Sequence, residues 1–230
     1  KAVSSKSLDR LVAAYTWTND GKMVALAADG FGDQLVNLST QGEATVLGAF
    51  PDRSVTSFDT HASKVAFIAE SAVHPQELWV RDESGDRQIS NLNNYYPALV
   101  APVRTNYVGA NGLTIEAALF TPSAAEPGIT GWPTVLLIHG GPTGRWSNKI
   151  NEWAQVLANR GFAVLAPNIR GSVGYGMEFI RLNRYDWGGA DYADALAGMD
   201  YLIKREFTDP ERMAIAGWSY GGYLSAWSIT

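Results

Sequence analysis

The spacing of hydrophobic positions changes about halfway along the chain. Up to about residue 100, short apolar runs alternate with turns rich in Asn, Asp and Gly, as is typical of antiparallel β-structure. After about residue 133, short apolar strands alternate with segments whose apolar residues recur every three or four positions, like one face of a helix. We therefore expect two parts, an all-β part over residues 1–100 and an α/β domain over residues 101–230.

Two stretches of the all-β part resemble each other. Lys22 and Lys64 occupy equivalent positions, as do Leu35 and Leu78, which gives a period of roughly 40 to 45 residues. Short strands repeated at this period are typical of β-propeller blades, and a closed propeller needs about 4 to 8 of them. The pattern therefore predicts a partial β-propeller, and a small β-sandwich with a chance similarity is the alternative.

The second part is predicted to open with a hairpin and to continue as alternating strands and helices. Residues 105–108 and 113–120 are expected to pair through a turn at 110–112. The expected strands are 134–138, 162–166 and 213–216, and the expected helices are 153–157 and 192–203. Because buried strands and amphipathic helices alternate, we expect a doubly wound, mostly parallel sheet.

The last predicted strand leads into Gly217-Trp218-Ser219-Tyr220-Gly221. This is the G-x-S-x-G pattern of a nucleophile elbow, in which a strand turns sharply into a helix and exposes a serine hydroxyl. Glycine is needed on both sides because side chains there would collide in so tight a turn. Ser219 is therefore the candidate catalytic nucleophile, and an ordinary glycine-bearing turn is the alternative.

A second glycine-rich stretch, His139-Gly140-Gly141-Pro142, follows the strand predicted at 134–138. In α/β-hydrolases this loop supplies one N–H of the oxyanion hole, and the residue after the nucleophile supplies the other. Gly141 and Tyr220 occupy these positions, and His139 is expected to order the loop. A plain turn and a phosphate cradle are the alternatives, but no Gly-Lys-Ser/Thr follows to support the cradle.

Composition and charge exclude several classes of function. The chain has 18 Lys and Arg against 23 Asp and Glu, a net charge of −5, so we expect no nucleic-acid partner. No apolar run approaches the roughly 20 residues of a membrane span, so no membrane partner is expected. The absence of Cys excludes disulfides and thiolate metal sites, and we expect neither metal nor cofactor. It also fits a reducing compartment, which predicts a cytoplasmic protein, although a removed leader stays open.

Four motifs in order along the chain resemble the prolyl oligopeptidase family of serine peptidases, in its acylaminoacyl-peptidase-like branch. They are residues 139–142, 170–176, 186–192 and 217–223. The resemblance implies an α/β-hydrolase domain preceded by a β-propeller, with Ser219 as nucleophile and Gly141 and Tyr220 as oxyanion donors. It also implies that Arg170 and Asp191 are structural or supporting residues near the site; a surface charge and a helix N-terminal acid are their alternatives.

The same resemblance implies a substrate class. In the family a propeller restricts entry to small peptides, so we expect a serine peptidase that cleaves short peptides through an acyl-enzyme on Ser219. Acylaminoacyl-, oligo- and dipeptidyl-peptidase activities stay open, and a homo-oligomer stays open as well. The alternatives are a carboxylesterase of the same fold and a non-catalytic binding protein that carries a propeller.

The chain departs from the family in its histidines. Hydrolases of this fold place the triad in the order Ser, Asp or Glu, His, whereas His61, His74 and His139 all precede Ser219. We therefore expect the triad Asp and His in a missing C-terminal half of the hydrolase domain, on the same or another chain. This chain alone is then expected to be an inactive fragment.

Overall fold

The computed structural model describes residues 7–94, 98–123 and 126–230. The chain divides into two compact units. The first comprises Lys1–Ala98 together with the short segments Ser147–Ile150 and Val173–Met177. The second comprises Leu99–Trp146, Asn151–Ser172 and Glu178–Thr230. The assignment of residues 1–100 and 101–230 to a propeller part and a hydrolase part stays a prediction.

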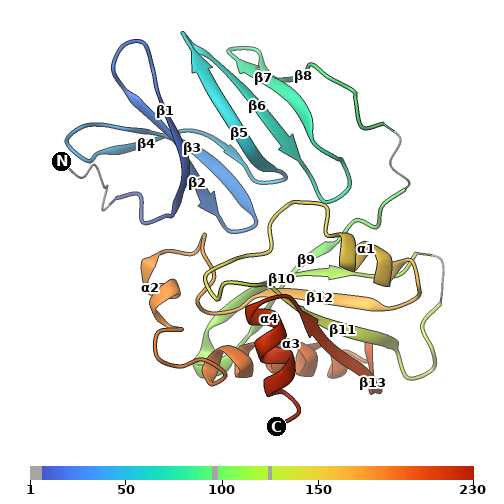
Figure 1. Cartoon of the computed structure of the whole chain (residues 1–230). Helices are drawn as coiled ribbons and strands as arrows, with labels where there is room; N and C mark the ends of the chain where they lie inside the picture. Colours follow the sequence, from blue (N-terminus) through green and yellow to red (C-terminus); the bar gives the residue numbers. More distant parts are fainter. Residues whose placement is uncertain (1–6, 95–97, 124–125) are drawn as a thin grey trace. The chain divides into compact units, whose positions relative to one another are not determined.

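The first unit contains two four-stranded antiparallel sheets, each made of consecutive strands (Figure 1). One sheet has β1 (Val12–Trp17), β2 (Met23–Asp29), β3 (Gly32–Leu38) and β4 (Ala44–Phe50). The other has β5 (Ser54–His61), β6 (Lys64–Glu70), β7 (Glu77–Asp82) and β8 (Gly85–Gln88). The repeated residues take equivalent places, because Leu35 and Leu78 lie in the third strand of their own sheets.

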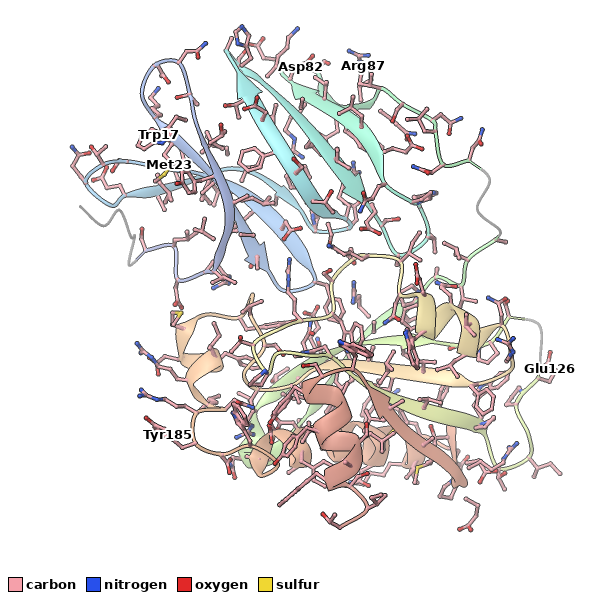
Figure 2. The ribbon with its side chains drawn as sticks, viewed as in Figure 1. Trp17, Met23, Asp82, Arg87, Glu126 and Tyr185 are labelled. Carbon is pink, nitrogen blue, oxygen red and sulfur yellow. The ribbon has the colours of Figure 1, made fainter. Side chains whose placement is uncertain are left out.

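Strand pairing and a shared core hold this unit together. Trp17 pairs with Met23 at the end of the β1–β2 hairpin, next to a turn of polar residues (Figure 2). Apolar side chains from both sheets form one cluster, in which the ring centroids of Phe50 and Phe67 lie 4.9 Å apart. Burying a side chain of this size contributes roughly 1.5 to 3 kcal/mol, so the contact joins the two sheets.

The second unit is built on a five-stranded sheet with the order β13-β11-β12-β10-β9. Its strands are β9 (Val103–Val108), β10 (Thr114–Phe120), β11 (Trp132–Ile138), β12 (Ala163–Asn168) and β13 (Thr208–Gly217). Its short 3-10 turn is η1 (Ala110–Gly112). The helices after β11 are α1 (Glu152–Ala158), α2 (Met177–Arg181), α3 (Ala190–Ile203) and α4 (Tyr220–Trp227). The strands and helices expected after residue 133 are therefore all present.

The expectation of a mostly parallel sheet is wrong, because the sheet is mixed. β11 runs parallel to β12 and β13, whereas β10 runs antiparallel to β12 and β9. The predicted hairpin is confirmed: β9 and β10 are joined through η1, and so short a connection allows only antiparallel pairing.

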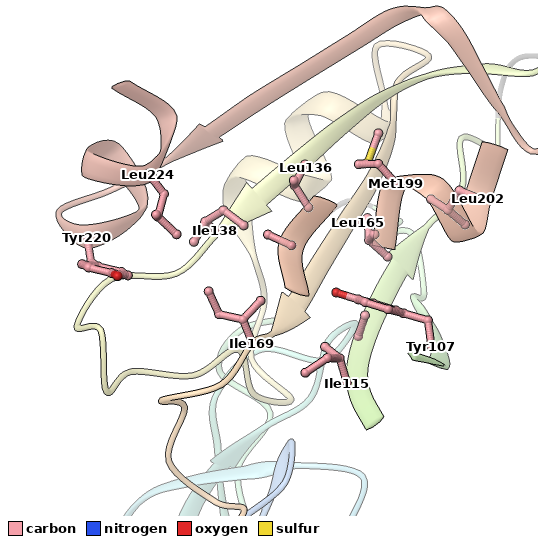
Figure 3. Packing of buried hydrophobic residues seen from close by; sticks show 12 residues of the cluster. Tyr107, Ile115, Leu136, Ile138, Leu165, Ile169, Met199, Leu202, Tyr220 and Leu224 are labelled. Atoms are coloured by element: carbon pink, nitrogen blue, oxygen red, sulfur yellow. The ribbon is translucent and has the colours of Figure 1, made fainter. Parts of the chain in front are cut away.

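The main core of this unit lies between the sheet and the helices α3 and α4 (Figure 3). Alternate residues of β11, Leu136 and Ile138, point into it, as the two-residue period of a strand requires. Met199 and Leu202 of α3 and Leu224 of α4 cover them. Figure 1 shows α1 on the opposite face of the sheet. The core thus fixes the end of β11 against the start of α4.

The last strand, β13, lies at an edge of the sheet. Among the described residues, β11 is the sole strand partner of β13. Met213 on this strand is 45% exposed, and Trp218 just after it is 80% exposed. Within the same described ranges, no helix is both long and apolar enough to cross a membrane.

Candidate active site

Ser219 lies in a strained turn between a strand and a helix. β13 ends at Gly217 and α4 begins at Tyr220, which leaves Ser219 as the N-cap of the helix. Its φ of 55° and ψ of −112° put a residue with a side chain in the left-handed region. Such a conformation costs about 1 to 3 kcal/mol and is found mostly at functional sites. Ser219 is exposed, and its hydroxyl makes no hydrogen bond to any described residue.

The two glycines of the motif are required by close backbone contacts. A Cβ on Gly217 would lie 2.5 Å from the carbonyl oxygen of Ile138 and 2.6 Å from Cα of Gly221. A Cβ on Gly221 would overlap the same carbonyl of Ile138. The collision inferred from the sequence therefore involves the end of β11 as well as the two glycines themselves.

Substitutions at two adjacent glycines test this packing. Gly221→Ala is expected to lower the free energy of unfolding by roughly 1 to 3 kcal/mol, because the new methyl group overlaps the backbone carbonyl of Ile138. Gly222→Ala is the matched control: the nearest atom to its Cβ, the carbonyl oxygen of Gly217, is 3.7 Å away. Alanine favours a helix by about 1 kcal/mol over glycine, so this variant should be as stable as the parent or more stable. Urea unfolding measures the stability of both variants. Equal stabilities of Gly221→Ala and Gly222→Ala would contradict the packing argument.

The loop after β11 lies directly against Ser219. A Cβ on Gly140 would be 3.4 Å from Cβ of Ser219 and 4.0 Å from its Oγ. Gly141 has φ 134°, a backbone conformation that residues with side chains rarely adopt. Within the described residues, the amides of Gly141 and Tyr220 have no acceptor. The two motifs therefore meet at one place, and the oxyanion roles of Gly141 and Tyr220 stay predictions.

His139 is buried, and both of its ring nitrogens have hydrogen-bond partners other than the nucleophile. Its Nδ1 donates to the carbonyl oxygen of Gly140 at 2.8 Å, and its Nε2 lies 2.8 Å from Oγ of Ser172. One ring nitrogen is thus hydrogen-bonded to the loop itself and the other to Ser172, and neither is hydrogen-bonded to Ser219. This geometry fits the loop-ordering role expected of His139 and excludes it as the base for Ser219.

His139 also makes stability depend on pH. Burial lowers the pKa of His139 to about 4, below the ordinary value of 6.5, while its bond to Gly140 opposes the shift. Protonation therefore favours the unfolded chain, so stability is full above about pH 6.5 and falls as the pH approaches 4. The expected loss is on the order of 3 kcal/mol. Urea unfolding of the parent and of His139→Gln between pH 7 and 4 measures it.

The variant that cannot titrate should show a flatter dependence of stability on pH than the parent over this range. His61→Gln removes an exposed histidine and is the control, with the pH dependence of the parent. If His139→Gln and the parent lose stability in parallel, the buried imidazole is not the cause.

Arg170 is buried and forms a two-point ion pair. Its Nε and Nη2 donate to the two carboxylate oxygens of Asp194 at 2.7 and 2.8 Å, and both side chains are almost fully buried. Asp194 also accepts the backbone N–H of Ala110 at 2.8 Å, which ties η1 to α3. The interpretation of Arg170 as a surface charge is therefore wrong, and the residue holds the sheet and α3 together.

Asp191 is fully buried in the first turn of α3. It has the favourable position of an acid at a helix N-terminus. It also accepts a hydrogen bond from the hydroxyl of Tyr220, the residue after the candidate nucleophile. The simple interpretation as a helix N-terminal acid is thus incomplete, because the side chain contacts the elbow.

Two residues that the sequence did not single out hold the far end of the oxyanion loop. The backbone N–H of Trp146 donates to Oδ1 of Asn168 at 2.7 Å, and Nδ2 of Asn168 donates back to the carbonyl of Trp146 at 3.0 Å. The indole N–H of Trp146 donates to the carbonyl of Leu137 at 3.0 Å. The sequence does show a polar residue, Asn168, at the end of a buried strand, but it does not show that the partner of this residue is Trp146.

A family model described as the prolyl oligopeptidase family matches residues 148–230. Over these residues the chain matches the prolyl oligopeptidase family. This confirms the resemblance drawn from the four motifs. Three of them lie within the matched range: residues 170–176, 186–192 and the elbow at 217–223.

Proteins named as peptidases are among those similar to this chain. An uncharacterized peptidase, YuxL of Bacillus subtilis, is 34% identical over 182 residues, which is 76% of this chain and 28% of that protein. Dipeptidyl-peptidase 5 of Schizosaccharomyces pombe is 29% identical over 205 residues, which is 87% of this chain and 30% of that protein. An acylaminoacyl peptidase structure from Pyrococcus horikoshii superposes with a TM-score of 0.84 at 25% identity, covering 97% of this chain and 36% of that one. The chain thus spans about a third of the length of these relatives.

The elbow presents hydrogen-bonding groups around Ser219. No group of three or more His, Cys, Asp or Glu residues that could hold a metal ion occurs in the ranges that the structure describes. The groups that the structure brings together at the elbow are the hydroxyl of Ser219, backbone N–H groups and the N-terminus of α4.

Proposed function

We propose that this chain carries the nucleophile and oxyanion hole of a serine peptidase that hydrolyses short peptides through an acyl-enzyme on Ser219. The observation that carries the proposal is the elbow itself. An exposed serine with φ 55° caps α4, and the glycine loop after β11 lies against its side chain. The names of the relatives, an acylaminoacyl peptidase and a dipeptidyl-peptidase, support peptide bonds as the target.

The proposed reaction follows from the groups around Ser219. Its Oγ attacks the carbonyl carbon of the peptide bond, and the carbonyl oxygen gains negative charge. The N–H groups of Gly141 and Tyr220 donate to that oxygen, and the positive end of α4 adds to the stabilisation. Losing one such donor costs about 3 to 4 kcal/mol of transition-state stabilisation, so the loop contributes a large part of the rate.

The base that takes the proton from Ser219 is proposed to lie outside these 230 residues. Both nitrogens of His139 are engaged elsewhere, and His61 and His74 are exposed residues of the first unit. A histidine and an orienting acid from another segment of the same polypeptide, or from another chain, would complete the triad.

The finer fold assignment is part of the same proposal. The two four-stranded sheets of the first unit are proposed to be consecutive β-propeller blades, because each is an antiparallel meander and the two share a sequence period. The second unit is proposed to be the first part of an α/β-hydrolase domain. Its support is the elbow at the end of β13 and the likeness to an acylaminoacyl peptidase.

A comparison of substrates tests the proposed activity. The complete natural polypeptide that contains this sequence is assayed with an N-acetylated dipeptide amide, the matching free-amine peptide and a simple alkyl ester. Hydrolysis of at least one peptide amide with kcat/KM above about 10⁴ M⁻¹s⁻¹, within the usual range for an enzyme, is expected. Hydrolysis of the ester alone would support a carboxylesterase, and no hydrolysis of any of the three would overturn the proposal.

A further inference from the structure

A buried carboxylate contacts the elbow from outside the catalytic motif. Asp191 is 0% exposed and is surrounded by hydrogen-bond donors. Its Oδ1 accepts the backbone N–H groups of Gly188 at 3.0 Å and of Tyr192 at 2.7 Å. Its Oδ2 accepts Nδ2 of Asn183 at 2.8 Å and the hydroxyl of Tyr220. These donors hold the carboxylate in a single orientation, which makes it a rigid anchor.

Tyr220 joins this anchor to the reaction centre. It is the first residue of α4 and directly follows Ser219, and it is 6% exposed. Its ring packs edge-on against Trp187, with centroids 5.5 Å apart. It also packs against the ring of Tyr223 in a tilted arrangement, with centroids 5.4 Å apart. Burial and the bond to Asp191 raise the pKa of Tyr220 above its ordinary value, so the hydroxyl stays a donor. The side chain is therefore fixed at its tip as well as at its backbone.

We propose that Asp191 is a positioning residue for the reaction, because it holds Tyr220 so that the Tyr220 amide points into the oxyanion hole. The inference rests on the proposed function. The strained Ser219 persists only if its surroundings determine its conformation, and the next residue along the chain is the one that Asp191 fixes. A displacement of about 1 Å at a catalytic group can cost on the order of 100-fold in rate. A Tyr220 that is held less firmly is therefore expected to lower kcat.

This role differs from that of the neighbouring acid on the same helix. Asp194 is paired with Arg170 and with the backbone of η1, and its hydrogen bonds within the described residues do not involve α4. Asp191 takes its donors from three places: the segment before α3, the start of α3 and the elbow. Figure 3 shows Tyr220 at the start of α4 with its hydroxyl directed away from the helix.

The test is a double-mutant cycle in the complete natural polypeptide. Asp191→Asn keeps the shape of the side chain, and Tyr220→Phe removes only the hydroxyl at the other end of the bond. Each single variant is expected to lower kcat by roughly 10- to 100-fold with little change in KM, because ground-state binding does not use this contact. The double variant is expected to be no slower than the slower single variant, because both substitutions break one interaction.

A matched control separates this effect from a general loss of stability. Tyr201→Phe removes another hydroxyl contact of α3, the 3.0 Å bond to Oγ of Thr105, which lies away from the elbow. Its kcat is expected to stay within about 2-fold of the parent at a temperature at which urea unfolding shows every variant folded. The rates of all variants are compared at that temperature.

Each outcome decides the inference. Losses of kcat in the two single variants that do not multiply in the double variant support it. Independent losses that multiply, a change in KM alone, or an unchanged kcat in either single variant would overturn it. An inactive parent polypeptide would instead refute the proposed peptidase function, which distinguishes the failure of that function from a failure of this inference.

Discussion

Replacing Ser219 with alanine is expected to abolish peptide hydrolysis by the complete polypeptide while leaving its stability nearly unchanged. The hydroxyl is exposed and makes no hydrogen bond to any described residue, so its removal creates neither a cavity nor an unpaired group. Loss of the nucleophile in a serine enzyme costs about 10⁶-fold in kcat. Turnover of the best peptide amide and urea unfolding of both proteins are the two measurements.

Ser228→Ala is the matched control for this prediction. Ser228 follows the same helix, and its hydroxyl donates to the carbonyl of Ser225 at 2.7 Å, outside the elbow. This variant is expected to keep its activity within about 2-fold, as surface substitutions usually do. Turnover retained in Ser219→Ala, or an equal loss in both variants, would show that Ser219 is not the nucleophile.

Gly141→Ala is expected to lower kcat by about 100- to 1,000-fold, the effect of losing one oxyanion donor. Gly141 has φ 134°, and its Cβ would lie 3.0 Å from the carbonyl carbon of Thr143 and overlap the amides of Thr143 and Gly144. The loop must therefore move, and the Gly141 amide moves with it. The measurement is kcat, with urea unfolding to confirm that the variant is folded.

A glycine elsewhere in the same unit separates the catalytic effect from backbone strain. Gly112 has φ 78°, and its Cβ would meet nothing within 4 Å. Gly112→Ala therefore strains the backbone, at about 1 kcal/mol, without moving the loop. Its kcat should match that of the parent. If Gly112→Ala and Gly141→Ala lose activity equally, the loss comes from strain, and Gly141 has no special role.

The local features of the fold could be predicted from the sequence where one short pattern determines them. The elbow is such a case, because the two glycines around Ser219 are dictated by a turn of five residues. The strand leading to it was predicted only in part. β13 begins at Thr208, ahead of the apolar run, and its first residues are polar: Asp209 and Arg212 form an ion pair at 2.6 Å. An edge strand needs few apolar residues, so hydropathy gives no signal there.

The contacts that support the site could not be predicted because they join distant segments. Asn168 meets Trp146, and Asp191 meets Tyr220, through pairs of residues that no helical or strand period connects. The mixed sheet was missed for a related reason. The hairpin of β9 and β10 was predicted, but its place beside β12 depends on tertiary packing. Arg170 likewise gives no sign in the sequence that its partner is Asp194.

Labelling with a fluorophosphonate probe tests the central claim most directly, because the probe reacts with an activated serine. The complete natural polypeptide is treated with the probe, and intact mass followed by peptide mapping locates the adduct. The account predicts one adduct, on Ser219, which is absent from Ser219→Ala and present in Ser228→Ala. No adduct on the parent, or an adduct on any other serine, would contradict it.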